Sequence, residues 1–433
     1  MKRTRKWAAV ALTMTLTATA CGSDNETSNT PEVTKTEEVT TPGEEDSVIN
    51  RIALTTSERR LVDGSNDFTF NLFREVFSPG KSIVLSPLSV TYALGMLANG
   101  ANGATRQQMT DVLGFADNGA DGINAFCKKM LTDAPRLDKA VEVLIANTIF
   151  LNKGYELLPS FVSKARENYD ATPETRDFAD GKTLDVINQW ASDHTKGMIE
   201  KILTTDEFNV ECVSYLLNAI YFKGVWSSPF EKDATSEETF TPGDGSAAKM
   251  LPMMHQQQEY GYAENDVCQA VRMPYGNGNF SMTILLPREG KSTADVLQQL
   301  DAKAWKDSYS SMPLTDVDLK MPRFETTTSG GEGNLVEPMK RLGMTLPFSA
   351  HDADFSMFCS VPTFIEMLKQ AARIRVDEEG SEAAAVTIVG MLETAIAPDL
   401  QKPVIRVHAN RPFVYVISEH TSGAIFFIGQ YAG

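Results

Sequence analysis

Residue types that do chemistry in enzymes are present in this chain of 433 residues, but they do not stand at catalytic spacings. No HExxH motif or other metal-ligand spacing occurs, and no GxSxG nucleophile elbow or glycine-rich phosphate loop occurs either. Two Ser-x-x-Lys strings, Ser78–Lys81 and Ser246–Lys249, hold the residues of a lysine-activated serine, whose chemistry would be acyl transfer. One lies in a Pro-Gly turn and the other in a glycine-rich loop, and neither begins a helix. We therefore predict that the chain is not an enzyme, needs no metal or cofactor, and binds other proteins. The histidines show no metal-ligand spacing at any of their five positions, which are His194, His255, His351, His408 and His420.

The stretch Glu378–Thr387, EEGSEAAAVT, opens a segment that runs to about Pro403 and is unusual for a loop. At a period of two, one face holds only compact side chains, which suit entry into a packed sheet. The other face begins with Glu382, a charge that belongs in water. Taken alone, the ten residues are more typical of a flexible, alanine-rich linker than of a strand that is exposed in one state and inserted in another. The compact face consists of Ser381, Ala383, Ala385, Thr387 and Val389.

The N-terminus has the pattern of an export signal. Four basic residues within 2–6 precede a short apolar run, Trp7–Ala20, which is too short to span a bilayer well. Small residues followed by Cys21 resemble a bacterial lipobox, in which the chain is cleaved before the cysteine and the thiol is lipidated. We therefore predict a lipoprotein signal peptide over residues 1–20 and lipidation of Cys21. The alternative is an ordinary signal peptide followed by a chance cysteine.

Residues 21–60 are predicted to form a disordered acidic tether. Gly22–Asn50 carries eight acidic residues against one lysine and few apolar ones, so it cannot bury enough surface to become ordered. Ser23–Glu26 resembles the acidic export signals of surface lipoproteins in some Gram-negative bacteria. We therefore expect a secreted lipoprotein at the outer membrane or cell surface, with its domain facing the periplasm or the exterior.

Residues 61–433 show no second linker, so we predict one large domain. The net charge of −17 argues against nucleic acid and anionic membranes as partners, which leaves the lipid anchor as the membrane contact. Four scattered cysteines form no CxxC motif, and we expect buried free thiols, with a disulfide as the alternative. They are Cys127, Cys212, Cys268 and Cys359.

Helices and strands alternate irregularly along this domain. Helices are expected at Asn66–Phe77, capped by Asn66 or Asp67, from Pro87 onward, and at Phe161–Tyr169 and Thr183–Thr195, with a turn at Gly100–Thr105. Strands are expected at Ser82–Leu85, Val141–Leu151, Val213–Phe222, Gln269–Met273, Phe280–Leu286, Asp316–Met321, Ile374–Val376, Val404–His408, Phe413–Ile417 and Ala424–Gly429. The order lacks the regularity of βαβ units, so we predict an α+β fold with large, mainly antiparallel sheets.

Eight stretches follow one another along this domain in a recognisable order: Val84–Met109, Asn188–Ile202, Asn218–Phe230, Met321–Phe324, Asn334–Met344, Ala353–Ser356, Glu378–Thr387 and Asn410–Gly429. Together they resemble the serpins, a family of serine protease inhibitors. The resemblance runs from Asn66 to the C-terminus and implies the serpin fold, with helices around large sheets and an exposed reactive-centre loop over about 378–403.

The resemblance implies roles for residues around the central sheet. Ser86, Ser89 and Asn218 match the shutter, and Trp226 matches the breach. Glu378 matches an acidic residue that pairs across the sheet with a base at the position of Arg323, although each could be a solvated surface charge. Gln370 stands where the family usually has histidine, and its amide can still donate and accept hydrogen bonds. The implied hinge consists of Glu378, Glu379, Gly380, Ser381, Glu382, Ala383, Ala384, Ala385, Val386 and Thr387.

The implied mechanism is that of a suicide substrate. The target protease attacks a loop carbonyl and forms an acyl-enzyme, after which the cleaved loop inserts into the central sheet and traps the enzyme. Spacing from Gly380 predicts cleavage at Thr394–Ala395, while Glu393–Thr394 or a bond after Leu392 are alternatives. These bonds suit elastase-like, Glu-specific and chymotrypsin-like proteases respectively.

Arg and Lys are absent from residues 381–400, which disfavours a trypsin-like target. Papain-like cysteine proteases are a further class of target, and the chain is expected to act as a monomer. Two other functions stay open at this stage: a non-inhibitory serpin that acts as a binding protein, and a hydrolase with an unrecognised site.

Overall fold

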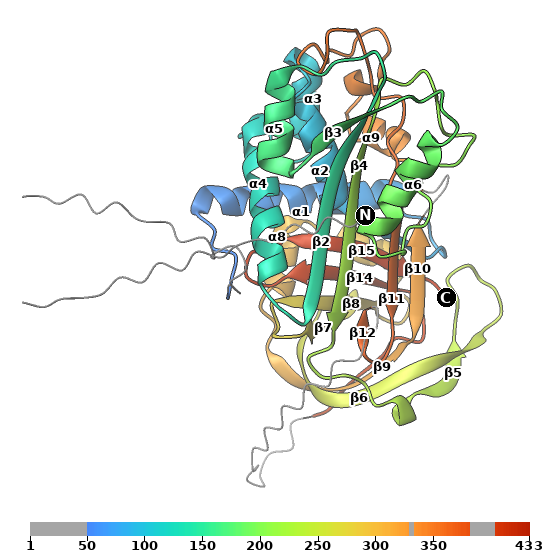
Figure 1. The fold of residues 1–433 in the computed structure, drawn as a ribbon. Helices are drawn as coiled ribbons and strands as arrows, with labels where there is room; N and C mark the ends of the chain where they lie inside the picture. The colour runs from blue at the N-terminus through green and yellow to red at the C-terminus, as the bar shows by residue number, and fades with distance from the viewer. Residues whose placement is uncertain (1–49, 329–332, 382–402) are drawn as a thin grey trace, which may run out of the picture. The chain divides into compact units, whose positions relative to one another are not determined.

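The computed structural model describes residues 50–328, 333–381 and 403–433. Within these ranges nine α-helices occur, and in Figure 1 most of the labelled helices lie in the upper part and at the left, while β5 (Ser236–Phe240), β6 (Lys249–Glu264) and β9 (Leu314–Pro322) extend below them. They are α1 Thr56–Val76, α2 Pro87–Ala98, α3 Gly103–Val112, α4 Gly119–Asp133, α5 Pro159–Tyr169, α6 Thr183–His194, α7 Thr293–Gln298, α8 Ala302–Tyr309 and α9 Val336–Arg341. None of the described helices has the length and apolarity needed to cross a bilayer.

Fifteen strands are described. They are β1 Ile83–Leu85, β2 Val141–Asn152, β3 Thr172–Arg176, β4 Ser214–Val225, β5 Ser236–Phe240, β6 Lys249–Glu264, β7 Cys268–Tyr275, β8 Phe280–Pro287, β9 Leu314–Pro322, β10 Phe324–Thr328, β11 Ala372–Val376, β12 Gly380–Ser381, β13 Ile405–His408, β14 Phe413–Glu419 and β15 Ile425–Tyr431. One sheet has nine strands in the order β1-β15-β14-β8-β7-β6-β9-β13, with β5 paired to β6. The other has six, in the order β10-β11-β12-β4-β2-β3.

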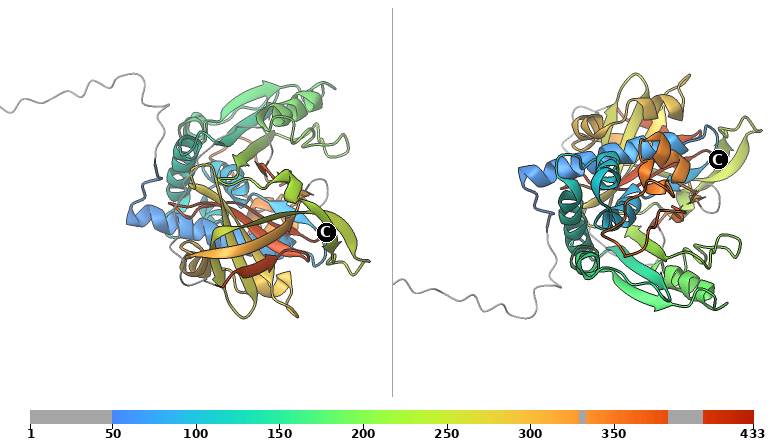
Figure 2. Two further views of the ribbon diagram at one scale, coloured as in Figure 1. Left: turned by 90° about the horizontal axis from the view of Figure 1, so that it is seen from below. Right: turned by 90° about the horizontal axis from the view of Figure 1, so that it is seen from above.

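All described strand pairs are antiparallel except β13 with β9 and β2 with β3. This confirms the predicted α+β class with mainly antiparallel sheets. In Figure 2 the teal and green strands lie on one side of the blue helices, and the gold strands with the deep-red C-terminal strands lie on the other. The orange strands β10 and β11 belong to the same sheet as the teal ones.

Helix α2 lies at the centre of this arrangement. Ser86 caps it and Pro87 occupies its first position, as the sequence predicts. Most of its residues are buried, because it packs against β4 of the six-stranded sheet and β15 of the nine-stranded sheet. A helix that is apolar on all sides is stable only where neighbours cover it, and here the two sheets do so.

Several element boundaries differ from the prediction. Helix α1 begins at Thr56 rather than Asn66, so the predicted tether boundary at residue 60 falls inside it. The cause is a capping box: the Thr55 Oγ1 atom accepts from the Glu58 amide at 3.2 Å, and the Glu58 carboxylate accepts from the Thr55 amide at 2.7 Å. The turn predicted at Gly100–Thr105 ends earlier, because α3 begins at Gly103. Helix α4 and the long strand β6 were not predicted.

Candidate functional site

The start of the unusual stretch is a strand in the six-stranded sheet. Gly380 and Ser381 form β12, in which Ser381 pairs with Val376 of β11 on one side and with Gly224 of β4 on the other. The approach to β4 is very close, since a Cβ atom on Gly380 would lie 2.0 Å from the Gly224 carbonyl oxygen. Only glycine fits at this position.

A tight turn leads into β12 from β11. The Asp377 amide donates to the Gly380 carbonyl at 2.9 Å, and the Asp377 carboxylate accepts from the Glu379 amide at 3.0 Å. Beyond the end of β4, the amides of Trp226 and Phe230 donate at 2.9 Å to the carbonyls of Glu379 and Glu378. Main-chain bonds on both sides therefore hold the beginning of the predicted hinge in the sheet.

Ser381 points into the core. It is 1% exposed, and its Oγ atom lies 2.5 Å from the Tyr275 hydroxyl. Tyr275 in turn stacks on Trp226, with ring centroids 4.3 Å apart and an interplanar angle of 10°. The compact face predicted from the sequence thus begins on the buried side of the sheet.

An ion pair between Arg323 and Glu378 lies beside β12 at this end of the six-stranded sheet. Arg323, which lies between β9 and β10, donates to the Glu378 carboxylate at 2.6 and 3.2 Å, and Thr235 Oγ1 donates to it at 2.7 Å. The Glu378 side chain is only 3% exposed, whereas that of Arg323 is 46% exposed. Burial raises the pKa of Glu378, but the hydrogen bonds from Arg323 and Thr235 outweigh it and hold that pKa below its ordinary value.

Two more groups complete this end. The Trp226 indole donates to the Asp377 carbonyl at 3.0 Å, which ties β4 to the turn. Lys232 lies 2.6 Å from the Glu379 carboxylate on the solvent side. The structure therefore brings together Arg323, Glu378 and Trp226, as the family resemblance implies, and it adds Thr235 and Tyr275, which no sequence pattern indicates.

Hydrogen bonds under the middle of the sheet involve the predicted shutter residues. The Gln370 amide is buried, accepts from the Ser86 amide at 3.0 Å and donates to the Ser86 carbonyl at 2.7 Å. Ser89 Oγ donates to Asn218 Oδ1, and the Asn218 amide donates to Asn147 Oδ1 at 2.8 Å. Asn147 was missed, although a polar residue in the apolar run VEVLIANTIFL was a usable signal.

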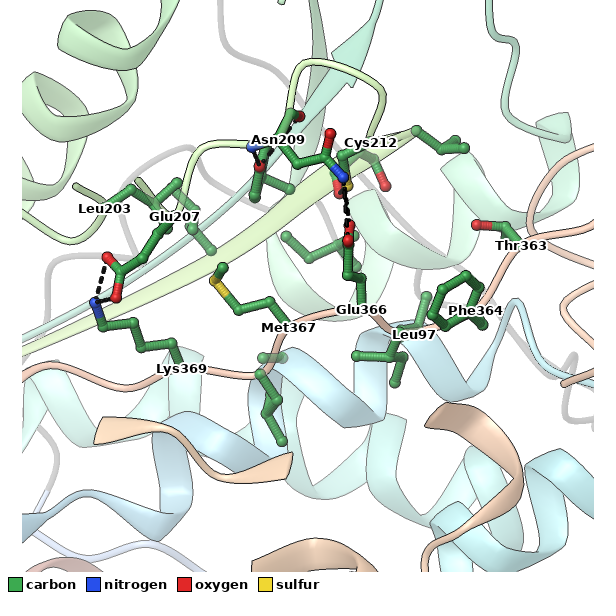
Figure 3. Close-up of a pocket in the computed structure, with 18 of the residues that line it drawn as sticks. Leu97, Leu203, Glu207, Asn209, Cys212, Thr363, Phe364, Glu366, Met367 and Lys369 are labelled. Carbon is green, nitrogen blue, oxygen red and sulfur yellow. Dashed lines mark hydrogen bonds and ion pairs between the residues drawn. The ribbon is translucent and has the colours of Figure 1, made fainter. Parts of the chain in front are cut away.

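Within the described residues, the edge of β4 that faces away from β2 is open for most of its length. In the described part of the chain, β4 pairs with β2 along one edge and, along the other, only with β12 at Gly224 and Val225. Further along that edge a cavity of about 610 Å³ lies between β4, α2 and residues 363–369 (Figure 3). Its walls are mainly apolar, and its polar pairs are Lys369 with Glu207 at 2.7 Å and Asn209 with Glu366 at 2.8 Å.

The remaining predicted residues are the four cysteines, which the structure describes, and a set of residues that lie outside the described ranges. The four described cysteines carry free thiols, of which three are buried and Cys212 is half-buried. Burial raises the pKa of all four thiols, which makes them poor nucleophiles. No group of His, Cys, Asp and Glu side chains within the described ranges could hold a metal ion. The predictions that lie outside the described residues concern the signal peptide, Cys21, hinge residues Glu382 to Thr387, and the bait residues Leu392, Glu393, Thr394 and Ala395.

Comparisons with known proteins agree with this arrangement. The sequence model of the family described as "Serpin (serine protease inhibitor)" matches residues 63–433. Antitrypsin of Bombyx mori is 31% identical over 384 residues, which cover 87% of this chain and 95% of the relative. Iripin-8 of Ixodes ricinus is 32% identical over 386 residues, which cover 86% and 93%.

Solved structures give the same result. The thermophilic serpin Tengpin in its native state superposes with a TM-score of 0.77 at 27% identity, covering 90% of this chain and 97% of Tengpin. A thyroxine-binding globulin in complex with thyroxine superposes with a TM-score of 0.74 at 26% identity, covering 86% and 99%. This chain belongs to the serpin family, and the predicted serpin fold is confirmed.

Proposed function

We propose that the chain is a suicide-substrate inhibitor of serine proteases. The observation that carries this proposal is β12: the predicted insertion strand already begins within the six-stranded sheet, where Gly380 and Ser381 pair with β4 and Ser381 also pairs with β11. The family match and the likeness to an antitrypsin give further support.

The register of β12 suits continued insertion. Ser381 faces the core beside Tyr275, so a strand continued from it would turn every second residue the same way. Those residues are Ala383, Ala385 and Thr387, which are small and uncharged, while Glu382 would face solvent. Insertion would therefore bury no charge and meet little steric resistance.

The sheet also offers a place for the strand. Because Ser381 pairs with Gly224, the same register continued along β4 would bring Thr387 opposite Asn218. The inserted strand would then satisfy the open edge of β4 and run toward the cavity beside Ser214–Leu217. Main-chain pairing along this edge would supply the driving force for insertion.

The reaction with the target protease would stop at the acyl-enzyme. The nucleophile of the protease attacks a loop carbonyl, the peptide C–N bond breaks, and the new amino terminus leaves as the acyl-enzyme forms. Insertion then carries the ester-linked protease away before water can hydrolyse the ester. The bait residues favour elastase-like targets if Thr394 supplies the carbonyl, and Glu-specific or chymotrypsin-like targets if Glu393 or Leu392 does. A cysteine protease would form the corresponding thioester.

The cavity favours a second candidate function, that of a non-inhibitory binding protein. Its volume of about 610 Å³ lies within the range of about 300–1,000 Å³ typical of small-ligand sites. One structural relative is a globulin that binds thyroxine. In this account a ligand, rather than the loop, would occupy the space beside β4.

The N-terminal pattern supports attachment to a bacterial membrane through lipidated Cys21, with the domain outside the cytoplasm. The lack of a catalytic spacing in the sequence supports the further proposal that the chain has no enzymatic activity of its own. Metabolic labelling with a fatty acid tests the anchor, since label should enter the chain and be lost in Cys21→Ser. Label retained in Cys21→Ser, or absent from both proteins, would contradict it.

The inhibitor function is tested by incubating the purified chain with elastase, chymotrypsin and a Glu-specific protease. We expect a complex that survives boiling in detergent with at least one of them, and sequencing of the released C-terminal peptide identifies the bond. If all three merely cleave the chain and stay active, the inhibitor proposal is wrong, and ligand binding becomes the better account.

A further inference from the structure

A line of buried hydrogen bonds connects the predicted shutter to three helices. It begins at Ser89 in α2, which donates to Asn218 in β4, and Asn218 donates to Asn147 in β2 at 2.8 Å. The Asn147 side-chain amide, which accepts that bond through its oxygen, donates through its nitrogen to the Tyr169 carbonyl at the end of α5, at 2.7 Å. The bonds therefore leave the six-stranded sheet and enter the helices that pack beneath it.

The line continues through the side chain of Tyr169. Its hydroxyl donates to Asn124 Oδ1 in α4 at 2.8 Å. Asn124 and Asn99 then exchange two amide hydrogen bonds, at 2.8 and 2.9 Å, and Asn99 is the C-cap of α2. The circuit thus begins near one end of α2 and returns to its other end.

The groups in this circuit are mostly buried, so the loss of any one of these hydrogen bonds should destabilise the fold. Tyr169 is 0% exposed, Asn124 is 4% exposed and Asn147 is 8% exposed. A buried polar group that loses its partner costs more free energy than an exposed one, because water cannot replace the bond. Strands β2 and β4 are consequently held over α2 at two points, by Ser89 directly and by Tyr169 through α5 and α4.

We propose that Tyr169 is a positioning residue for loop insertion. Under the proposed function, on which this inference rests, the inserting strand must take its place beside β4, and β4 must shift over α2 to admit it while α2 stays under the sheet. The Ser89–Asn218 bond resists this movement at one point. The Tyr169 hydroxyl, by fixing the end of α5 against α4, resists it at the second and so helps to set the rate at which the sheet opens.

Tyr92 provides a matched control within the same region. It is also 0% exposed, and its ring meets that of Tyr169 edge to face at 6.3 Å. Its hydroxyl donates to the Cys127 carbonyl at 2.9 Å, which ties α2 to α4 but does not reach the sheet. Tyr92→Phe and Tyr169→Phe therefore each remove one buried hydroxyl bond, and only the second change breaks the circuit.

The test measures sheet opening without a protease, so its outcome does not depend on whether the chain inhibits one. A synthetic peptide with the sequence of residues 381–392, SEAAAVTIVGML, is incubated with each full-length protein, and its uptake is followed on native gels. We expect uptake by Tyr169→Phe to be faster than wild type by roughly threefold to tenfold, since one buried hydrogen bond is lost. Tyr92→Phe should take up the peptide at the wild-type rate.

Hydrogen exchange of the β4 amides provides a second readout that needs no peptide and decides the matter if the wild-type chain takes none up. Exchange over Ser214–Val225 should accelerate in Tyr169→Phe and not in Tyr92→Phe. If both variants accelerate equally, the effect is general loosening of the helices and the proposal is wrong. Wild-type behaviour of Tyr169→Phe in both measurements would also overturn it.

Discussion

Gly380→Ala is the substitution that most directly disturbs the pairing of β12 with β4. The new Cβ atom would lie 2.0 Å from the Gly224 carbonyl oxygen and 2.8 Å from the Val225 Cα atom, so β12 must move away from β4. Both contacts are with backbone, which cannot swing aside as a flexible side chain can. Overpacking of this kind costs about 1–3 kcal/mol. At 1.4 kcal/mol per tenfold change, the ratio of paired to unpaired β12 should fall by roughly fivefold to 140-fold.

Hydrogen exchange at the Trp226 and Phe230 amides reports this change, because both donate to carbonyls next to β12. Their exchange should accelerate in Gly380→Ala, and more of the chain should be cleaved per inhibited protease. Gly181→Ala is the matched control, since no neighbouring atom lies within 4 Å of its added Cβ. Unchanged exchange in Gly380→Ala, or the same change in both variants, would refute this description of the hinge.

Three further predictions concern the residues around the hinge. Gln370→Leu leaves the buried Ser86 amide without its side-chain acceptor, so the free energy of unfolding in urea should fall by about 1–3 kcal/mol; an unchanged urea midpoint and slope would contradict the predicted role of Gln370. The pKa of Glu378 is lower folded than its ordinary 4.5, so its pairing with Arg323 stabilises the fold above that value. That contribution should fade as the pH drops through the lower folded pKa, and thermal unfolding between pH 6 and 3 should be less pH-dependent in Glu378→Gln; equal slopes would count against it. Ala383→Arg would have to bury a charge on insertion, so it should turn the inhibitor into a substrate, and gels showing undiminished complex would contradict insertion.

The elements that were predicted correctly carry strong local signals. Strands β2 and β4 are long and mainly apolar, which predicts buried strands. The N-cap Ser86 and the following Pro87 mark the start of α2. Helix α4 begins with a Gly-Ala-Asp-Gly sequence, which is typical of a loop, and its packing against α1, α2, α3 and α5 stabilises it. Strand β6 lacks clear alternation because its environment changes along its length, from exposed at Lys249 to buried near Tyr260.

The site was predictable only where residue type limits the choices. The compact face of the hinge could be read from Ser381 onward, but its pairing with β4 depends on Gly224, which lies 157 positions earlier. Arg323 and Glu378 were matched through the family resemblance, since nothing local links two charges 55 residues apart. The cavity could not be predicted, because it results from the open edge of β4 and the path of residues 363–369.

The central claim is that the cleaved loop becomes a new strand beside β4. Hydrogen exchange of residues 214–223, compared before and after cleavage of the chain within residues 388–402 by a non-target protease, tests it most directly. The account predicts strong new protection along this edge after cleavage, together with a higher thermal unfolding temperature. Equal exchange and an unchanged unfolding temperature in the cleaved chain would contradict it.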